Sequence, residues 1–171
     1  MRKVLYILSQ LSDADVEWLA RAGQRHAVAP GAILIEEGKS ADALIFVLDG
    51  EVSVATAGLG EVTRFGAGEI LGEMSFVDKS PPSATVAATA PTQILAVDRE
   101  TLARQLEADP GFASRFYLAV AMYLSVRLRA TMSRFGKDGA DEHDELNLEL
   151  LDTVHIAGAR FDRMIKRLLG V

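Results

Sequence analysis

Short β-rich segments separated by glycine fill residues 26–97 and limit the possible fold more than any other feature of the sequence. They read AILIEEG, ALIFVLDGEVSVATAG, EVTRFGAGEI and SATVAATAPTQILAV. Several short strands at regular spacing are typical of an antiparallel sandwich or barrel. Asp49-Gly50 lies between two apolar runs and predicts a β-hairpin with a tight turn. We therefore expect a mainly β architecture in this part of the chain.

Helical patterns flank the β-rich segment on both sides. Residues 12–22 follow a helix pattern in which Ser12 is the N-cap and Asp15 occupies the capping-box position three residues later. Residues 99–108 form a second helical pattern with Asp98 as its cap. The sequence thus predicts a β domain with helices at both ends.

A long helix is expected over residues 110–135, because Asp109-Pro110 resembles a cap followed by proline at the first helical position. Side chains spaced at alternating steps of four and three residues form a seam along this helix, and most of the seam is apolar. Such a seam can pack on another helix, within one chain or across two. The seam residues are Tyr117, Ala121, Leu124, Leu128, Thr131 and Phe135.

The remaining residues differ in composition from the β domain. Residues 136–147 are acidic and contain glycine, which indicates a linker. An amphipathic helix is expected over residues 147–169, with an apolar side formed by Leu150, Val154, Ala157, Phe161, Met164 and Leu168. We therefore divide the chain into a domain at residues 1–135 and a linker with a C-terminal helix at residues 136–171.

Composition disfavours several classes of function. Acidic residues outnumber basic residues 24 to 18, and the formal charge of −6 argues against a broad nucleic-acid surface. The chain has no cysteine and only three histidines (His26, His143 and His155), too few and too scattered for a metal-dependent active site. No apolar stretch is long enough to span a bilayer. We expect a cytoplasmic protein without catalytic residues, metal, cofactor, nucleic-acid partner or membrane partner.

The stretch GEMSFVDKSPPSATVAA at residues 72–88 has the features of a ligand site. Gly72 allows a ligand to approach the backbone, and Glu73 can accept hydrogen bonds from sugar hydroxyl groups. One helical turn near residues 73–77 would present backbone N–H groups to an anion. Two structural interpretations remain open: Glu73 can complement the helix dipole, and Ser83 and Thr85 can be ordinary strand residues.

This stretch resembles the phosphate-binding cassette of the cyclic nucleotide-binding domain family, which includes catabolite activator proteins, kinase regulatory subunits and nucleotide-gated channels. The family's pattern is approximately Gly-Glu-Leu/Met-Ala-Leu-Ile, a short loop, and then Pro-Arg-Ser/Ala-Ala-Thr-Val. This chain has GEMSFV at residues 72–77 and PPSATV at residues 81–86. The resemblance extends over about residues 10–135. It implies an antiparallel β-roll (a double-stranded β-helix or jelly roll) with C-terminal helices.

The resemblance also implies a ligand pocket formed by Gly72, Glu73, Met74, Pro82, Ser83, Ala84 and Thr85. Glu73 matches the glutamate that binds the ribose 2′-hydroxyl, and the backbone near Gly72 and Ser83 matches the phosphate cradle. The family's phosphate-binding arginine falls on Pro82. Proline removes both the guanidinium and a backbone donor, so the cassette is degenerate at this position.

The sequence therefore indicates a regulatory or assembly module for signal transduction that binds cyclic AMP or cyclic GMP weakly or not at all. The alternative is a functional cyclic nucleotide sensor, with Lys79 as a substitute cation, that regulates a separate effector. A catabolite-activator type of transcription factor is disfavoured because residues 136–171 are too few for a DNA-binding domain. The helix at residues 110–135 matches the family's dimerisation helix, so we expect a homodimer and a separate protein partner.

Overall fold

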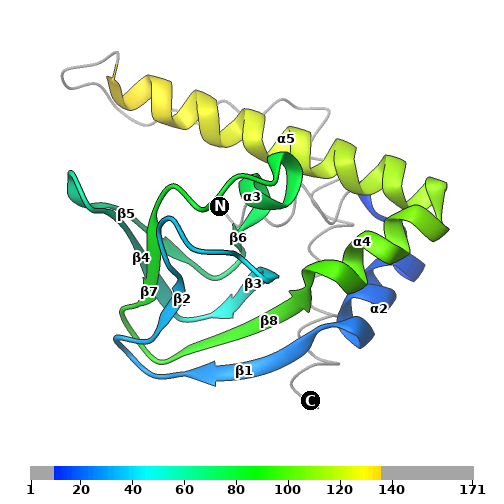
Figure 1. Cartoon of the computed structure of the whole chain (residues 1–171), viewed down its shortest axis with the longest axis horizontal. Coiled ribbons are helices and arrows are strands. Elements are labelled where there is room, and N and C mark those ends of the chain that lie inside the picture. The colour runs from blue at the N-terminus through cyan, green and yellow to red at the C-terminus, as the bar shows by residue number, and fades with distance from the viewer. Residues whose placement is uncertain (1–9, 136–171) are drawn as a thin grey trace.

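The computed structural model describes residues 10–135, with side chains as far as Met132. Helix α2 (Asp13–Ala22) precedes the strands, and helices α4 (Arg99–Ala108) and α5 (Pro110–Phe135) follow them (Figure 1). The strands are β1 (Gln24–Val28), β2 (Ile33–Ile35), β3 (Ala43–Asp49), β4 (Glu51–Thr56), β5 (Gly60–Gly66), β6 (Ile70–Leu71), β7 (Thr85–Ala88) and β8 (Thr92–Asp98). The short helix α3 (Glu73–Asp78) lies between β6 and β7. The expected linker and C-terminal helix lie outside the described residues.

Two four-stranded antiparallel sheets make up the β domain. One sheet has the strand order β1-β8-β3-β6 and the other has the order β2-β7-β4-β5. Helices α4 and α5 follow directly after the last strand. The expected mainly β fold, an antiparallel β-roll with C-terminal helices, is confirmed.

Strand β3 is buried on both faces and joins the two parts of the core. Ile45 and Val47 point into the roll, where they pack with residues of both sheets. Leu44 and Phe46 point to the opposite face, where they pack against the helices. Because successive side chains of a strand alternate between its two faces, double-sided burial explains the uninterrupted apolar run ALIFVL in the sequence.

The prediction of a β-hairpin at Asp49-Gly50 is wrong. Strands β3 and β4 belong to different sheets, and Gly50 forms the corner where the chain crosses between them. Gly50 has a φ of 94°, and a Cβ at this residue would lie 2.5 Å from the Thr92 hydroxyl oxygen. The Asp-Gly pair therefore marks a close approach to the turn before β8, whereas β4 forms its hairpin with β5.

The expected helix caps are confirmed, and one of them also joins distant elements. The Ser12 N–H donates to Asp15 Oδ2 (2.7 Å), and the Asp15 N–H donates to the Ser12 hydroxyl (3.2 Å). Arg115 of α5 donates to both oxygens of the same carboxylate, at 2.6 and 2.9 Å. Burial acts to raise the pKa of Asp15, but the hydrogen bonds from Arg115 and Ser12 outweigh it and hold this pKa below its ordinary value.

Helix α5 has a buried face and an exposed apolar face. The buried face packs on the roll and on the other helices through Phe112, Phe116, Ala119, Val120 and Tyr123. The expected seam lies on the other side, where Tyr117 is 48% exposed and Leu128 is 61% exposed. Ala121 and Thr131 are also exposed, Leu124 is half-buried, and the side chain of Phe135 lies outside the described part. The seam is therefore available to a partner of the kind that the sequence predicts.

Between residues 10 and 135, the chain has no helix that is both long and apolar enough to cross a membrane.

Replacing Asp15 by Asn should lower the free energy of unfolding at pH 7 by about 1–3 kcal/mol, because Arg115 loses a charged acceptor while remaining partly hydrated. A lowered pKa means that the stability from Asp15 is present above its unfolded pKa and is lost as the pH falls through its folded pKa. The difference between wild type and variant should therefore shrink between pH 7 and pH 3. Urea unfolding followed by Trp18 fluorescence measures it.

Glu107→Gln is the control, since it removes an exposed carboxylate from helix α4. It should change the stability by less than about 0.5 kcal/mol. A loss from Asp15→Asn that is equal at both pH values would contradict the assignment.

Candidate functional site

Gly72 forms the corner between β6 and α3 at the start of the stretch that the sequence singles out. Its φ of 83° lies in the left-handed region. A Cβ at this residue would lie 3.0 Å from the Ala43 carbonyl oxygen. Glycine therefore lets the chain turn sharply against β3, so that α3 starts directly at the edge of the sheet.

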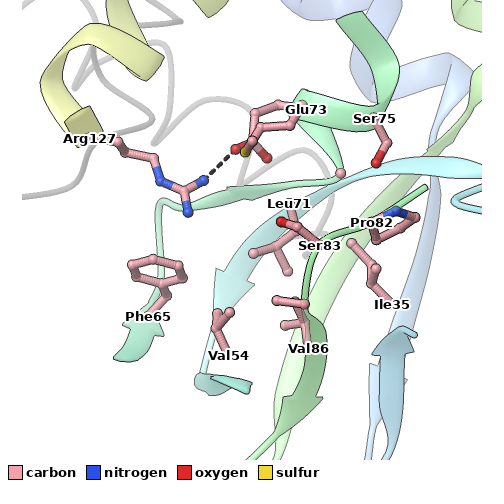
Figure 2. A pocket seen from close by; sticks show the side chains of 13 residues that line it. Ile35, Val54, Phe65, Leu71, Glu73, Ser75, Pro82, Ser83, Val86 and Arg127 are labelled. Atoms are coloured by element: carbon pink, nitrogen blue, oxygen red, sulfur yellow. Dashed lines mark hydrogen bonds and ion pairs between the residues drawn. The ribbon is translucent and has the colours of Figure 1, made fainter. Parts of the chain in front are cut away.

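A cavity of about 70 Å³ lies beside α3 (Figure 2). Most of its wall is apolar, and its charged groups are the Glu73 carboxylate and the Arg127 guanidinium. Ligand pockets usually enclose roughly 300–1,000 Å³. The cavity is therefore smaller than a usual ligand pocket, and it opens to solvent. The lining residues are Ile35, Val54, Phe65, Leu71, Gly72, Glu73, Met74, Ser75, Pro82, Ser83, Ala84, Val86 and Arg127.

The fold brings most of the sequence-predicted pocket residues to this cavity. Gly72, Glu73 and Met74 reach it from the start of α3, and Pro82, Ser83 and Ala84 reach it from the loop before β7. Thr85 is not among the lining residues. Its hydroxyl accepts a hydrogen bond from the Glu37 N–H (3.1 Å), which agrees with the structural interpretation of this residue.

Pro82 is a buried part of the cavity wall. Its carbonyl oxygen accepts a hydrogen bond from the Gly38 N–H (2.9 Å), which ties the loop to the turn after β2. Proline has neither an N–H nor a charged group, so it offers an anion nothing to bind. At the position where the family resemblance places an arginine, the cavity therefore has an apolar surface.

Glu73 is paired with Arg127 of helix α5, 54 positions further along the chain. The guanidinium Nη1 donates to Glu73 Oε1, and the Glu73 side chain is 4% exposed whereas the Arg127 side chain is 26% exposed. Figure 2 shows the Arg127 side chain reaching from α5 to the carboxylate. The group that the sequence assigns to a sugar hydroxyl is therefore already bound by a side chain of the protein.

Two aromatic rings flank the Arg127 guanidinium. Its central carbon lies 5.0 Å from the ring centroid of Phe65 and 5.6 Å from that of Tyr123. The Tyr123 hydroxyl accepts from the Ile70 N–H (3.2 Å) and lies 2.8 Å from Glu69 Oε2, to which it can donate. Cation–π contacts of this kind are stronger when the cation is partly desolvated. The Arg127 guanidinium is therefore in contact with Glu73, Phe65 and Tyr123 on three sides.

Burial sets the electrostatics of the site. It raises the pKa of the Glu73 carboxyl above its ordinary value; Arg127 opposes this rise, and the nearby Glu69 adds to it. Burial also raises the pKa of the Tyr123 phenol, followed in importance by the Glu69 charge. Tyr123 is thus a neutral hydrogen-bonding group, and Glu73 depends on Arg127 to stabilise its charged form.

Sequence reasoning missed Arg127, Phe65 and Tyr123 as parts of the site. A signal for Arg127 was present: it falls on the face of α5 that also carries Phe116, Val120 and Tyr123, and a lone cation on an apolar face needs a buried acid. The substitute cation considered from the sequence, Lys79, is exposed and does not line the cavity. Among the described residues, Arg127 is the cation that lines it.

No group of three or more acidic or histidine side chains that could hold a metal ion occurs in the part of the chain that the structure describes.

Comparison with known proteins adds independent findings. Residues 25–109 match the family model of the cyclic nucleotide-binding domain. The chain is 32% identical over 91 residues to a cyclic nucleotide-gated potassium channel of Rhizobium etli, which is 53% of this chain and 25% of the channel. It is 31% identical over 105 residues to a cAMP-dependent protein kinase regulatory subunit of Yarrowia lipolytica, which is 61% of this chain and 28% of the subunit.

Solved structures share the fold. A cyclic nucleotide-binding domain from Methylobacillus flagellatus has a TM-score of 0.70 and 28% identity, with 82% of this chain and 85% of that chain covered. The catabolite activator protein of Thermus thermophilus has a TM-score of 0.58 and 22% identity, with 96% of this chain and 87% of that chain covered. The latter likeness concerns the fold alone.

Replacing Gly72 by Ala should destabilise the domain more than replacing Gly38 by Ala. Both glycines have positive φ, so each substitution costs about 1–2 kcal/mol in backbone strain. Gly38 has no atom within 4 Å of its added Cβ, whereas Gly72 meets the Ala43 carbonyl and should cost about 1 kcal/mol more. Urea unfolding of both variants compares the losses, and equal losses would show that contact with Ala43 does not constrain this corner.

Proposed function

Because residues 25–109 form a cyclic nucleotide-binding domain in sequence and in fold, we propose that this chain is a cytoplasmic regulatory or assembly module with weak affinity for cyclic AMP and cyclic GMP. It acts through binding and conformation, without catalysis of its own. Its ligand pocket is the cavity beside α3, and its output surface is the exposed face of α5.

One observation carries the proposal: Pro82 is a buried wall residue at the position where the family resemblance places the phosphate-binding arginine. A hydrogen bond to a charged group contributes about 1.5–3 kcal/mol. Losing one weakens binding by roughly 10- to 150-fold. An affinity in the micromolar range would fall toward the sub-millimolar range.

A second candidate function is a working cyclic nucleotide sensor. Glu73, Ser83 and Ala84 line the same cavity, which supports a retained sugar and phosphate site. Such a sensor needs a cation for the phosphate, and the lining cation, Arg127, is engaged by Glu73. The weak-binding module is therefore favoured over the sensor.

The matched relatives point to a partner. Two are named as a cyclic nucleotide-gated potassium channel and a cAMP-dependent protein kinase regulatory subunit. We infer from their names that this chain also regulates an effector protein. The apolar face of α5, with Tyr117, Leu118, Leu128 and Met132 each about half exposed or more, is the surface on which a homodimer would form.

Calorimetric titration with cyclic AMP and cyclic GMP tests the proposed affinity. The wild type should bind both nucleotides more weakly than the low-micromolar range. Pro82→Arg should bind at least one of them about 10- to 150-fold more tightly, because it restores a charge-assisted contact. Thermal unfolding should show that Pro82→Arg is folded. Low-micromolar binding by the wild type would establish the sensor instead.

Lys79→Ala is the control for this experiment. Its side chain is exposed and lies outside the cavity wall, so its removal should leave the affinities of wild type and Pro82→Arg unchanged.

Light scattering tests the proposed homodimer. At micromolar concentration the wild type should have twice the mass of one chain, and Leu128→Glu should have the mass of one chain because a charge is placed in the apolar face. Leu59→Glu changes another exposed leucine, in the β4–β5 turn (82% exposed, against 61% for Leu128), and should leave the dimer intact. A one-chain mass for the wild type would reject the dimer.

A further inference from the structure

The charged side chains that line the cavity beside α3 neutralise each other. Glu73 and Arg127 are the charged lining residues, and the Arg127 Nη1 donates to Glu73 Oε1. The remaining lining side chains are apolar or carry a neutral hydroxyl group, as Ser75 and Ser83 do. The described wall of the cavity therefore has no net formal charge.

A second buried carboxylate adds negative charge near this wall. Glu69 is 6% exposed, and its Oε2 lies 2.8 Å from the Tyr123 hydroxyl oxygen. Burial raises the pKa of the Glu73 carboxyl, and the charge of Glu69 adds to the rise, so the two acids are close enough to interact. Among the described residues, two buried acids therefore accompany the one cation that lines the cavity, which disfavours an anionic ligand.

The Glu73 carboxylate can still accept a hydrogen bond from a ligand. A carboxylate has about four lone-pair sites on its two oxygens. The described residues occupy one of them through Arg127 and one through the Glu73 backbone N–H. A hydroxyl group of a ligand can therefore bond to Glu73 while the pair with Arg127 stays in place.

The size of the cavity fits one ring of a ligand. A water molecule needs roughly 10–15 Å³ of such space, so the cavity of about 70 Å³ has room for about five groups of that size, as in a sugar ring. Its apolar wall, which includes Val54, Phe65 and Val86, suits the C–H groups of a ring. Because the cavity opens to solvent, the rest of a larger ligand can lie outside it.

We propose that this cavity selects an uncharged ligand that carries a hydroxyl donor, as a nucleoside does, and disfavours the cyclic phosphate of the same nucleoside. The hydroxyl group bonds to Glu73, the ring packs on the apolar wall, and no phosphate lies at Pro82, which has neither an N–H nor a charge. This selection rests on the proposed function in one respect, since it takes the cavity beside α3 as the ligand pocket. It goes beyond weak affinity for cyclic nucleotides by naming the class of ligand that binds instead.

The charge of the phosphate decides the preference. An anion that leaves water without a counter-charge loses hydration energy, which a neutral ligand does not lose. In Figure 2, Arg127 lies next to Phe65 on one side of the cavity, and Pro82 lies on the other side. The guanidinium is bound to Glu73, so its charge is not available at the Pro82 side. Backbone N–H groups can contact a phosphate there, but they supply only partial charges.

A comparison of charged and uncharged forms of one nucleotide tests the selection. Cyclic AMP and its methyl ester share the base and the sugar, but the phosphate of the ester carries no charge. The wild type should bind the ester and adenosine each at least about fivefold more tightly than cyclic AMP, because neither brings an unpaired charge. NMR titration measures the affinities, with backbone amides beside the cavity as reporters (Gly72, Glu73, Ser83 and Ala84). Cyclic AMP that binds as tightly as the uncharged ligands, or uncharged ligands that leave these amides unshifted at millimolar concentration, would overturn the proposal.

Three uncharged ligands identify the group that is recognised. Adenosine should bind about fivefold more tightly than 2′,3′-dideoxyadenosine or better, because the latter lacks the ring hydroxyl groups that can bond to Glu73. Equal affinities of these two would overturn the bond to Glu73. Methyl β-D-ribofuranoside carries the sugar without the base. Weaker binding of the riboside than of adenosine supports a nucleoside, and equal binding supports a simple sugar with the same hydroxyl chemistry.

Pro82→Arg should reverse the order, so that cyclic AMP binds more tightly than its methyl ester, because a cation is added to the apolar end of the cavity. Pro82→Gln is the matched control: its side chain is long and polar but uncharged, and it should keep the wild-type order. Both variants retain the carbonyl that accepts from the Gly38 N–H. An unreversed order in folded Pro82→Arg would contradict the role of charge, and the wild-type comparison does not depend on either variant.

Charge selection and weak affinity fail in different ways. Low-micromolar binding of cyclic AMP by the wild type contradicts the proposed function, whereas charge selection concerns the ratio of two affinities. If the methyl ester binds still more tightly, charge selection stands without the weak affinity. If cyclic AMP and the ester bind weakly and equally, the proposed function stands and charge selection is overturned.

Discussion

A buried carboxylate needs a counter-charge, and in this domain the counter-charge for Glu73 comes from helix α5 through Arg127. The pair joins two segments that are far apart in the chain, the start of the cassette and the later turns of the last described helix. Arg115 makes a similar pair with Asp15 at the other end of the same helix. Helix α5 is therefore positioned on the roll by buried charges at two points and by aromatic packing between them.

This arrangement also determines the chemical character of the cavity. The cavity of about 70 Å³ has an apolar wall at Pro82 and an ion pair at Glu73. Neither end offers a free cation to an anionic ligand among the described residues. Both features limit what the cavity offers to an anion: Pro82 has neither an N–H nor a charge, and the Arg127 guanidinium is bound to Glu73.

Much of the fold could be predicted from residue patterns because those patterns act locally. The capping box of Ser12 and Asp15 joins residues that are three positions apart. The cap at Asp98 also bonds to a residue three positions along the chain. The Asp49-Gly50 prediction failed for the opposite reason. A turn signal reports that the chain bends, but whether the next strand pairs with the previous one or enters the second sheet depends on strands that follow much later, here β8 and β7.

The sequence by itself determined the alternation of strands and helices, the caps, the glycine at residue 72 and the proline at residue 82, because each depends on backbone chemistry or spacing within a few residues. Only the tertiary structure decided that Glu73 is paired with Arg127, that Phe65 and Tyr123 enclose the guanidinium, and that the seam of α5 faces outward. The contacts of Arg127 with Glu73 and Phe65 join segments more than 50 positions apart, and the energy of a buried charge depends on which groups the fold places next to it.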